Sequence, residues 1–179
     1  MIISEIGWNF LGDIKLAKKM IDSSKNSGCK IVKFQLWDPS NLKKGEWDND
    51  GRREIYQKAF LSHDRYLELF NYSKSINIEC FASIFSDKEY DILKSVSTKY
   101  IKIPSVEAYD IDLIKKSLND FEYVFVSTGA LKKNELENLL QFKNLEKFFI
   151  LHCVSTYPLD YDYCNFKKFF YLKENFRNV

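Results

Sequence analysis

The sequence has no apolar run that approaches the roughly 20 residues needed to span a bilayer. Its first ten residues lack the basic segment, apolar stretch and small-residue cleavage site of a secretory signal. Charge of one sign is also scarce, since the formal net charge is only +2. Such a balance does not indicate nucleic acid or a membrane surface as a partner. We therefore expect a soluble cytoplasmic protein.

The four cysteines have no metal-ligand spacing, and they are Cys29, Cys80, Cys153 and Cys164. The first three fall in or beside predicted strands, where a small, buried, reduced thiol is the usual role. A reducing cytoplasm fits this pattern better than a disulfide framework, because large parallel α/β domains seldom need one.

Histidine is rarer still, with only His63 and His152. A lone histidine is more often structural than a metal ligand. His152 lies beside Cys153, which raises a metal-site hypothesis, but no pair of residues here makes a convincing site. We predict no metal ligands within this chain.

Regular structure is indicated along almost the whole 179-residue chain, with no internal linker and no second domain. Short β-branched or aromatic runs predict six strands. Amphipathic patterns between and after them predict six helices. The strands are expected at residues 2–6, 30–36, 78–84, 100–103, 123–127 and 147–153, and the helices at 13–27, 64–75, 87–95, 110–117, 132–142 and 166–176. Residues 37–61 form a long polar insertion, and loops of that length are usually functional or mobile.

Six consecutive βα units leave two architectures open, a doubly wound open sheet and a (β/α)8 barrel. A doubly wound sheet usually has a glycine-rich phosphate loop after its first strand. The segment 5–13, EIGWNFLGD, has neither that pattern nor a P-loop lysine. We favour a parallel TIM-type barrel, present as about six βα units. A complete barrel needs about 250 residues, so the chain is short by roughly two units.

Polar residues recur at the predicted strand ends, where parallel strands bring their side chains to one pocket. Two lysines and several hydroxyls among them indicate an anionic, phosphorylated ligand. These residues are Glu5, Lys33, Gln35, Ser83, Lys102, Ser105, Glu107, Ser127, Thr128, Ser155 and Tyr157.

Six short segments recur in order at the predicted strand ends: EIGxNxxGD from Glu5, KFQ from Lys33, FASIF from Phe81, YIKIPSxE from Tyr100, STG from Ser127 and LHCVSTYP from Leu151. Taken in order, these segments resemble the N-terminal barrel of the sialic acid synthase family, which includes N-acetylneuraminate, legionaminate and pseudaminate synthases. Each segment alone is a weak signal, but their order and separations make the resemblance specific over residues 2 to about 165.

The resemblance implies condensation of phosphoenolpyruvate with an N-acetylated hexosamine, either N-acetylmannosamine or a diacetamido-trideoxyhexose. Carbon 3 of phosphoenolpyruvate attacks the aldehyde, water adds to carbon 2, and phosphate leaves. It also implies a divalent metal, Mn²⁺ or Mg²⁺, that polarises the aldehyde and activates water. The metal ligands of the family lie outside this chain. A homo-oligomer, namely a dimer, is expected.

The resemblance assigns phosphoenolpyruvate binding to two lysines and four serines. Lys33 and Lys102 would be the cations, since each ammonium group carries three donors for phosphate and carboxylate oxygens. The alternative is that both lysines extend into solvent from strand ends. The serines, whose alternative role is to cap the following helix, are Ser83, Ser105, Ser127 and Ser155.

Glu5 resembles the catalytic carboxylate of the family. It is equally able to form a structural ion pair with Lys33 or Lys102. The resemblance assigns sugar binding to Gln35, Glu107 and Tyr157. Phe10 stands where the family usually has a histidine, which changes the local polar contacts.

The resemblance also implies that the last two βα units, both metal histidines and a C-terminal antifreeze-like domain are absent from residues 1–179. The sheet is then completed by another copy or another polypeptide, or the chain is a fragment. The leading hypothesis is a synthase barrel, present as its N-terminal part. The alternatives are a catalytically inactive remnant or assembly partner, and an unrelated barrel such as another phosphoenolpyruvate-using aldolase.

Overall fold

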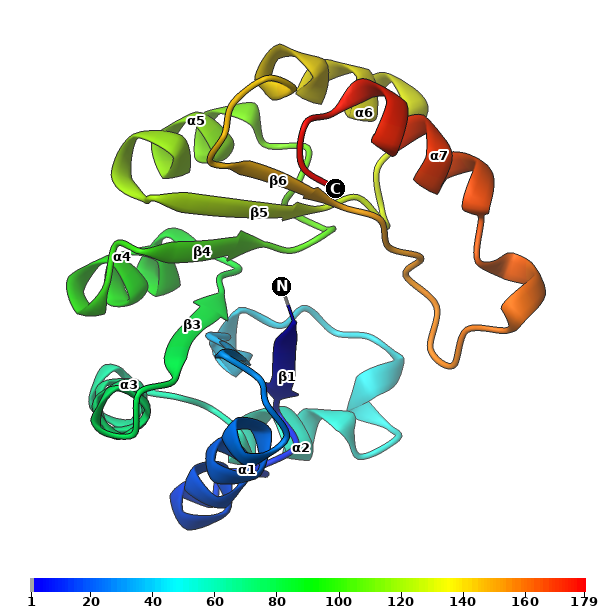
Figure 1. Ribbon diagram of the computed structural model, residues 1–179. Coiled ribbons are helices and arrows are strands. Elements are labelled where there is room, and N and C mark those ends of the chain that lie inside the picture. Colours follow the sequence, from blue (N-terminus) through cyan, green and yellow to red (C-terminus); the bar gives the residue numbers. More distant parts are fainter. Residues whose placement is uncertain (1) are drawn as a thin grey trace. The chain divides into compact units, whose positions relative to one another are not determined.

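The computed structural model describes residues 2–179, and the chain divides into two compact units with the boundary between Ser97 and Thr98. Each unit is an alternation of strands and helices (Figure 1). No helix within residues 2–179 combines the length and the apolar character that crossing a membrane requires.

The first unit contains three parallel strands that pair in sequence order. Glu5 lies opposite Lys33, and Lys33 lies opposite Phe81, so these three residues form one row across the sheet. The elements are β1 (Ile3–Gly7), α1 (Ile14–Asn26), β2 (Ile31–Gln35), α3 (His63–Ser75), β3 (Glu79–Ser83) and α4 (Asp87–Val96).

Side-chain caps fix where the helices of this unit begin. The Asp13 carboxylate accepts hydrogen bonds from the amides of Lys15 and Leu16, at 2.8 and 3.1 Å, and so satisfies donors that the first turn of α1 leaves unpaired. Ser62 accepts from the Arg65 amide at the start of α3. These caps hold both helices against the sheet at fixed starting points.

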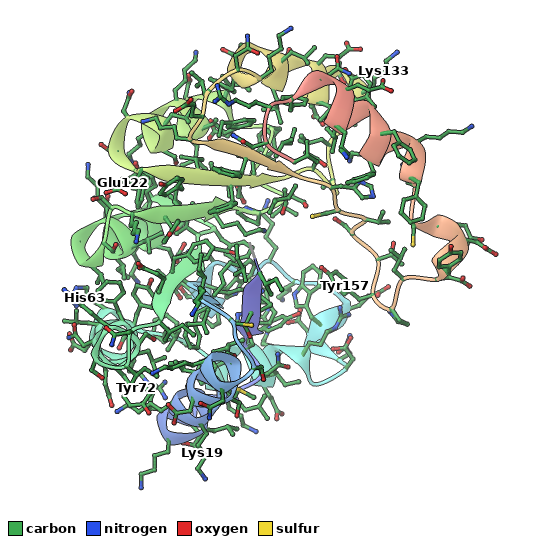
Figure 2. All side chains as sticks on the ribbon, in the orientation of Figure 1. Lys19, His63, Tyr72, Glu122, Lys133 and Tyr157 are labelled. Carbon is green, nitrogen blue, oxygen red and sulfur yellow. The ribbon has the colours of Figure 1, made fainter. Side chains whose placement is uncertain are left out.

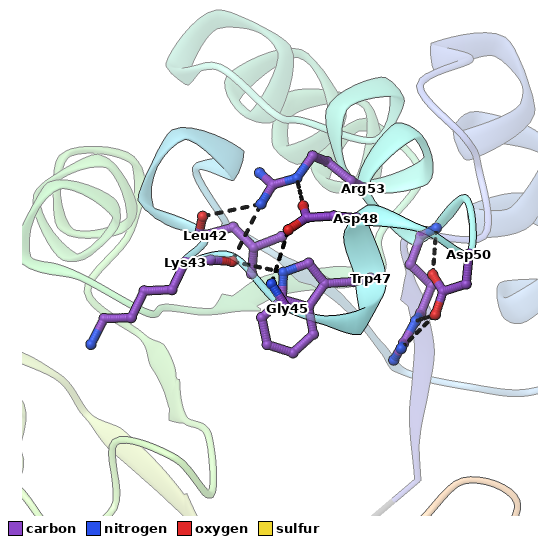
Figure 3. Close-up of polar contacts among 8 residues, drawn as sticks. Leu42, Lys43, Gly45, Trp47, Asp48, Asp50 and Arg53 are labelled. Carbon is purple, nitrogen blue, oxygen red and sulfur yellow. Dashed lines mark hydrogen bonds and ion pairs between the residues drawn. The ribbon is translucent and has the colours of Figure 1, made fainter.

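The insertion between β2 and α3 is more ordered than the predicted polar loop. It contains η1 (Pro39–Asn41), η2 (Glu46–Asp48) and α2 (Arg52–Lys58). Charged and backbone groups tie it together (Figure 3): the Arg53 guanidinium contacts the Asp48 carboxylate, and the Trp47 indole N–H donates to the Lys43 carbonyl at 2.8 Å. Local polar contacts of this kind have no hydrophobic period, so the sequence pattern did not predict the short helices.

The second unit also contains three parallel strands in sequence order. Aromatic rings from alternate positions pack across one face of its sheet. Tyr100 stacks on Tyr123 at 5.2 Å, and Phe125 packs against Phe149 at a tilt, with 5.0 Å between ring centroids. The elements are β4 (Tyr100–Ile103), α5 (Ile111–Asp120), β5 (Tyr123–Ser127), α6 (Lys133–Asn138), η3 (Leu139–Phe142), β6 (Phe148–Leu151), η4 (Tyr161–Tyr163) and α7 (Phe166–Asn175).

All six predicted strands and six predicted helices are present, with shifted ends. The first strand runs one residue later than predicted, and the sixth, expected over residues 147–153, covers only Phe148–Leu151. The helix predicted over 132–142 divides into α6 and the tighter η3. Such differences of one or two residues are ordinary at element ends.

Gly12 offers a test of the packing in the first unit. Its φ is +83°, and a Cβ there would collide with the Lys58 carbonyl at the end of α2. We predict that Gly12→Ala lowers the free energy of unfolding by about 3 kcal/mol, combining backbone strain with a steric clash. Chemical denaturation measures this change.

Gly28→Ala is the matched control, because Gly28 has a φ of +88° but no atom within 4 Å of the added Cβ. It should cost only the strain, about 1–2 kcal/mol. Equal losses in the two variants would contradict the close approach of α2 to Gly12.

Candidate functional site

Alternation along the strands of the first unit gathers polar groups on one face of the sheet. Glu5, Lys33 and Gln35 share that face with Ser83, and Gln35 lies opposite Ser83 in the register. The opposite face carries apolar residues such as Val32 and Phe34, both fully buried. Glu5 and Lys33 lie in the middle of their strands, which corrects the prediction that they end them.

Lys33 is the centre of this group. Its ammonium Nζ lies 2.5 Å from Glu5 Oε2 and donates to Ser83 Oγ at 2.9 Å. Only 8% of Lys33 is exposed. Burial lowers the pKa of Lys33, while the charge and hydrogen bond of Glu5 oppose that effect. The ion pair left open at the sequence level therefore forms between Glu5 and Lys33.

Glu5 is held from a second side and remains partly accessible to solvent. Gln35 Nε2 donates to Glu5 Oε1 at 3.2 Å, and 46% of the Glu5 side chain is exposed. Gly7 has a φ of +55°, and a Cβ there would lie 3.0 Å from Glu5 Oε1. Glycine at this position thus leaves room for the carboxylate. A cleft of about 380 Å³ adjoins Glu5 and Asn9 beside α1.

The second unit gathers hydroxyl groups around Gly129. The Gly129 amide donates to Ser105 Oγ at 3.0 Å. A Cβ on Gly129 would lie 3.0 Å from Ser105 Oγ and still closer to the Ser155 hydroxyl, so both serines border this glycine. Ser127 is buried, and its hydroxyl accepts from the Cys153 thiol at 3.4 Å. Three of the predicted serines therefore meet in one small area.

Lys168 on α7 supports the loop that carries Gly129. Its ammonium group donates to the Thr128 carbonyl, and burial lowers its pKa. A cleft of about 460 Å³ lies beside it, lined in part by Gly129 and Cys153. No sequence motif pointed to Lys168, because its contact joins residues that are 40 positions apart.

The other predicted site residues of the second unit lie on separate segments of the chain. Side chains alternate between the two faces of a strand, so Lys102 lies on the same face of β4 as Tyr100. Lys102 pairs with Phe125 and is the second-to-last residue of β4. Glu107 is half-buried in the turn after β4, where its amide donates to the Pro104 carbonyl. Tyr157 is 94% exposed on the segment after β6 (Figure 2).

The residues described do not supply a metal centre. Across residues 2–179, no three His, Cys, Asp or Glu side chains come together in a way that would hold a metal ion. His152 Nε2 lies 2.8 Å from the Cys164 carbonyl oxygen, a structural contact. The four cysteines are free thiols, and burial raises the pKa of Cys80 to about 12.

The chain is similar to a known protein family and to several characterised proteins. The family model described as the NeuB family matches residues 20–179. An N-acetylneuraminate-9-phosphate synthase from Drosophila melanogaster is 32% identical, over 99% of this chain and 51% of its own length. A pseudaminic acid synthase from Helicobacter pylori is 32% identical, over 88% of this chain and 50% of its own length. The chain thus spans about half the length of these curated relatives.

Solved structures match the fold. A crystal structure of N-acetylneuraminic acid (sialic acid) synthetase from Leptospira borgpetersenii, in complex with citrate, matches with a TM-score of 0.81 and 28% identity, over 97% of this chain and 61% of that one. A putative spore coat polysaccharide biosynthesis protein E from Chromobacterium violaceum matches with a TM-score of 0.83 at 18% identity. This match covers 99% of this chain and 56% of that one. The predicted fold class, an incomplete TIM-type barrel of about six βα units, is confirmed against the doubly wound alternative.

Replacing Lys33 by methionine tests whether its charge is kept at a cost to stability. Met keeps the apolar stem, and the remaining Glu5 carboxylate is hydrated because it is 46% exposed. We predict that Lys33→Met leaves the free energy of unfolding at pH 7 unchanged or raises it by about 1–2 kcal/mol. Urea denaturation measures the difference.

The effect should also depend on pH, with a definite sign. The pKa of Lys33 is lowered in the folded chain, so the unfolded chain binds more protons between that pKa and the usual 10.5. Wild-type stability therefore gains relative to Lys33→Met as pH rises through this window. A loss of several kcal/mol in the variant at pH 7 would instead mean that Lys33 is a structural residue.

Proposed function

Because the chain belongs to the NeuB family, we propose that it carries part of the active site of a nonulosonic acid synthase. The reaction is the condensation of phosphoenolpyruvate with an N-acetylated hexosamine, N-acetylmannosamine or a diacetamido-trideoxyhexose. The relatives of this chain include pseudaminic and N,N'-diacetyllegionaminic acid synthases, and their functions support this class of reaction. Residues 1–179 would form the N-terminal part of the synthase barrel.

The observation that carries the proposal is the buried ammonium group of Lys33. A charged amine out of water is costly unless a function or a partner retains it. Here its partners are one half-exposed carboxylate and one hydroxyl, Glu5 and Ser83. An incoming dianion such as phosphoenolpyruvate would complete its coordination with charge-assisted hydrogen bonds.

Two lysines and four serines are proposed to bind phosphoenolpyruvate. Lys33 and Lys102 are the two cations. The hydroxyl donors are Ser83, Ser105, Ser127 and Ser155. The Gly129 amide, which donates to Ser105 Oγ in the free chain, is one further donor to a phosphate oxygen.

The chemistry forms two bonds between heavy atoms and breaks one. Carbon 3 of phosphoenolpyruvate attacks the aldehyde carbon of the open-chain sugar, and the aldehyde oxygen takes up a proton. Water then bonds to carbon 2 and gives up one proton to a base. The bond from carbon 2 to the phosphate oxygen breaks as the new hydroxyl becomes the carbonyl, and the proton of that hydroxyl leaves with phosphate. Glu5 is the group of this chain that accepts the proton of the attacking water, because it is partly exposed and is held in place by Gln35.

Gln35, Glu107 and Tyr157 are proposed to contact the sugar. Gln35 is positioned for this role because its amide lies at the end of β2, beside the carboxylate of Glu5. Amide and carboxylate groups pair well with sugar hydroxyls. Tyr157 is almost fully exposed, so its phenol is accessible to a ligand.

The expected divalent metal, Mn²⁺ or Mg²⁺, would be held by polypeptide outside residues 1–179, since the described residues do not gather a ligand set. A completed enzyme is proposed to be a homodimer. The second candidate function is a catalytically inactive binding or assembly partner.

Calorimetric titration with phosphoenolpyruvate tests the anion site. We predict that Lys33→Met and Lys102→Ala each weaken binding by about tenfold or more, because each removes a charge-assisted hydrogen bond worth about 1.5–3 kcal/mol. Lys30→Met and Lys99→Ala are matched controls, since these lysines precede the same two strands at their opposite ends. Equal affinities in all four variants, or no binding by the wild type, would contradict the site.

Phosphate release tests the assignment of the metal ligands to other polypeptide. Residues 1–179 with Mn²⁺, phosphoenolpyruvate and N-acetylmannosamine should release phosphate orders of magnitude more slowly than a complete synthase, since metal assistance is worth several kcal/mol of barrier. Synthase-level turnover by this chain alone would contradict the assignment of the metal ligands to other polypeptide.

A further inference from the structure

The peptide group that joins Thr128 to Gly129 is bound at both of its polar ends. Its carbonyl accepts a hydrogen bond from the Lys168 ammonium group, and its N–H donates to Ser105 Oγ at 3.0 Å. This peptide bond is trans, so its C=O and N–H lie in one plane and point in opposite directions. Lys168 on α7 therefore fixes one end of a peptide group whose other end is a donor of the proposed anion site.

Thr128 itself is anchored to the end of β6. Its amide and its hydroxyl both donate to the Leu151 carbonyl, at 3.1 and 3.0 Å, and the residue is fully buried. These two bonds fix the residue, but they do not restrict rotation about its ψ angle, which turns the following peptide group. The contacts of Lys168 and Ser105 oppose this rotation.

Lys168 is kept in a half-buried position beside a neutral partner. Burial lowers the pKa of Lys168, and its ammonium group donates to a carbonyl rather than to a carboxylate. Among the described residues, no Asp or Glu lines the cleft of about 460 Å³ beside it. Removing an ammonium group from water without a counter-ion costs stability. The contact with Thr128 is thus retained against an electrostatic cost, which favours a functional role.

Helix capping does not account for this contact. Lys147 shows the usual case, since its ammonium group donates to the Leu118 and Phe121 carbonyls at the C-terminal end of α5. Carbonyls at a helix end have no partner within the helix and commonly bind a lysine. Thr128 follows β5 and does not belong to a helix. The lysine of α7 instead binds a loop carbonyl, in the peptide group that carries the anion-site donor.

We propose that Lys168 is a positioning residue, which fixes the Thr128–Gly129 peptide group so that the Gly129 N–H is aimed at the bound anion. This inference rests on the proposed function, in which that N–H donates to a phosphate oxygen. Lys168 acts through the peptide group and does not touch the anion itself. Its charge also draws electron density toward the carbonyl oxygen, which makes the N–H of the same peptide a stronger donor.

The physical benefit is preorganisation. A donor that already points at the anion needs no rearrangement when the anion binds. Without the ammonium group the peptide can turn over, which would place the Thr128 carbonyl oxygen where the N–H donor lay. An oxygen there repels a phosphate oxygen. Loss of Lys168 therefore weakens a donor and also admits an unfavourable state.

Amide NMR of the unliganded chain tests the orientation of this peptide group. The chain has only six glycines, so ¹⁵N-glycine labelling gives a simple spectrum in which Gly129 is followed. We expect Lys168→Met, which keeps most of the apolar stem, to speed hydrogen exchange of the Gly129 amide by about fivefold or more. Lys168→Arg, which keeps a cationic donor, should restore slow exchange.

Calorimetric titration with phosphoenolpyruvate measures the consequence for the anion. Lys168→Met should weaken binding by about fivefold or more, and Lys168→Arg should bind within about twofold of the wild type. Lys167→Met is the matched control, since Lys167 is the exposed neighbour on α7 and also lines the cleft. It removes the same charge and leaves the contact with Thr128 in place. Its phosphoenolpyruvate affinity and its Gly129 exchange should stay at the wild-type values.

A measurement on the wild type keeps the test decisive if a variant does not fold, which thermal unfolding reveals. Saturating phosphoenolpyruvate should shift the Gly129 amide proton signal downfield, because a charged phosphate oxygen is a stronger acceptor than the Ser105 hydroxyl. A Gly129 signal that does not move would overturn the proposal.

The remaining outcomes separate this inference from the proposed function. Absence of phosphoenolpyruvate binding by the wild type would overturn the proposed function, and this inference with it. Three results alongside normal wild-type binding would overturn the role of Lys168 alone. They are unchanged affinity or unchanged exchange in Lys168→Met, whatever its thermal stability, equal losses in Lys168→Met and Lys168→Arg, and a loss in Lys167→Met equal to that in Lys168→Met.

Discussion

The buried ammonium group of Lys33 is the constraint around which the first unit is organised. Three strands must hold their register for Glu5, Lys33 and Ser83 to meet, since the contacts of 2.5 and 2.9 Å join residues from β1, β2 and β3. A slip of one residue in any strand would turn the polar side chain to the apolar face. The register that buries Val32 and Phe34 on one side is therefore the register that assembles the charged group on the other.

The second unit assembles its polar group from hydroxyls and a backbone amide. Aromatic rings such as Tyr123 and Phe125, which contact rings of the neighbouring strands, occupy one face of its sheet, and Ser127 follows them at the end of β5. Gly129 then allows the serines after β4 and β6 to approach its backbone closely. Apolar packing near the beginning of the strands and polar groups near their ends are the division expected of a TIM-type barrel, in which strand ends carry function.

The alternation of strands and helices was predictable because burial imposes a period on the sequence, and motif order made the family resemblance specific. The pair of Glu5 with Lys33 was foreseen only as an alternative, since the sequence does not state which cation a carboxylate meets. The Ser105–Gly129 contact joins residues 24 positions apart and has no local signal. The contact of Lys168 with the Thr128 carbonyl was missed for the same reason.

The central claim is that the Lys33 ammonium group is retained in the sheet to bind an anion. Selective ¹⁵N-lysine NMR reports the titration of Lys33 directly, with Lys30 as the exposed reference. The account predicts a lowered pKa for Lys33 in the free chain, because burial disfavours the charged form. Saturating phosphoenolpyruvate should raise that pKa. A Lys33 pKa that does not respond to phosphoenolpyruvate would contradict the account.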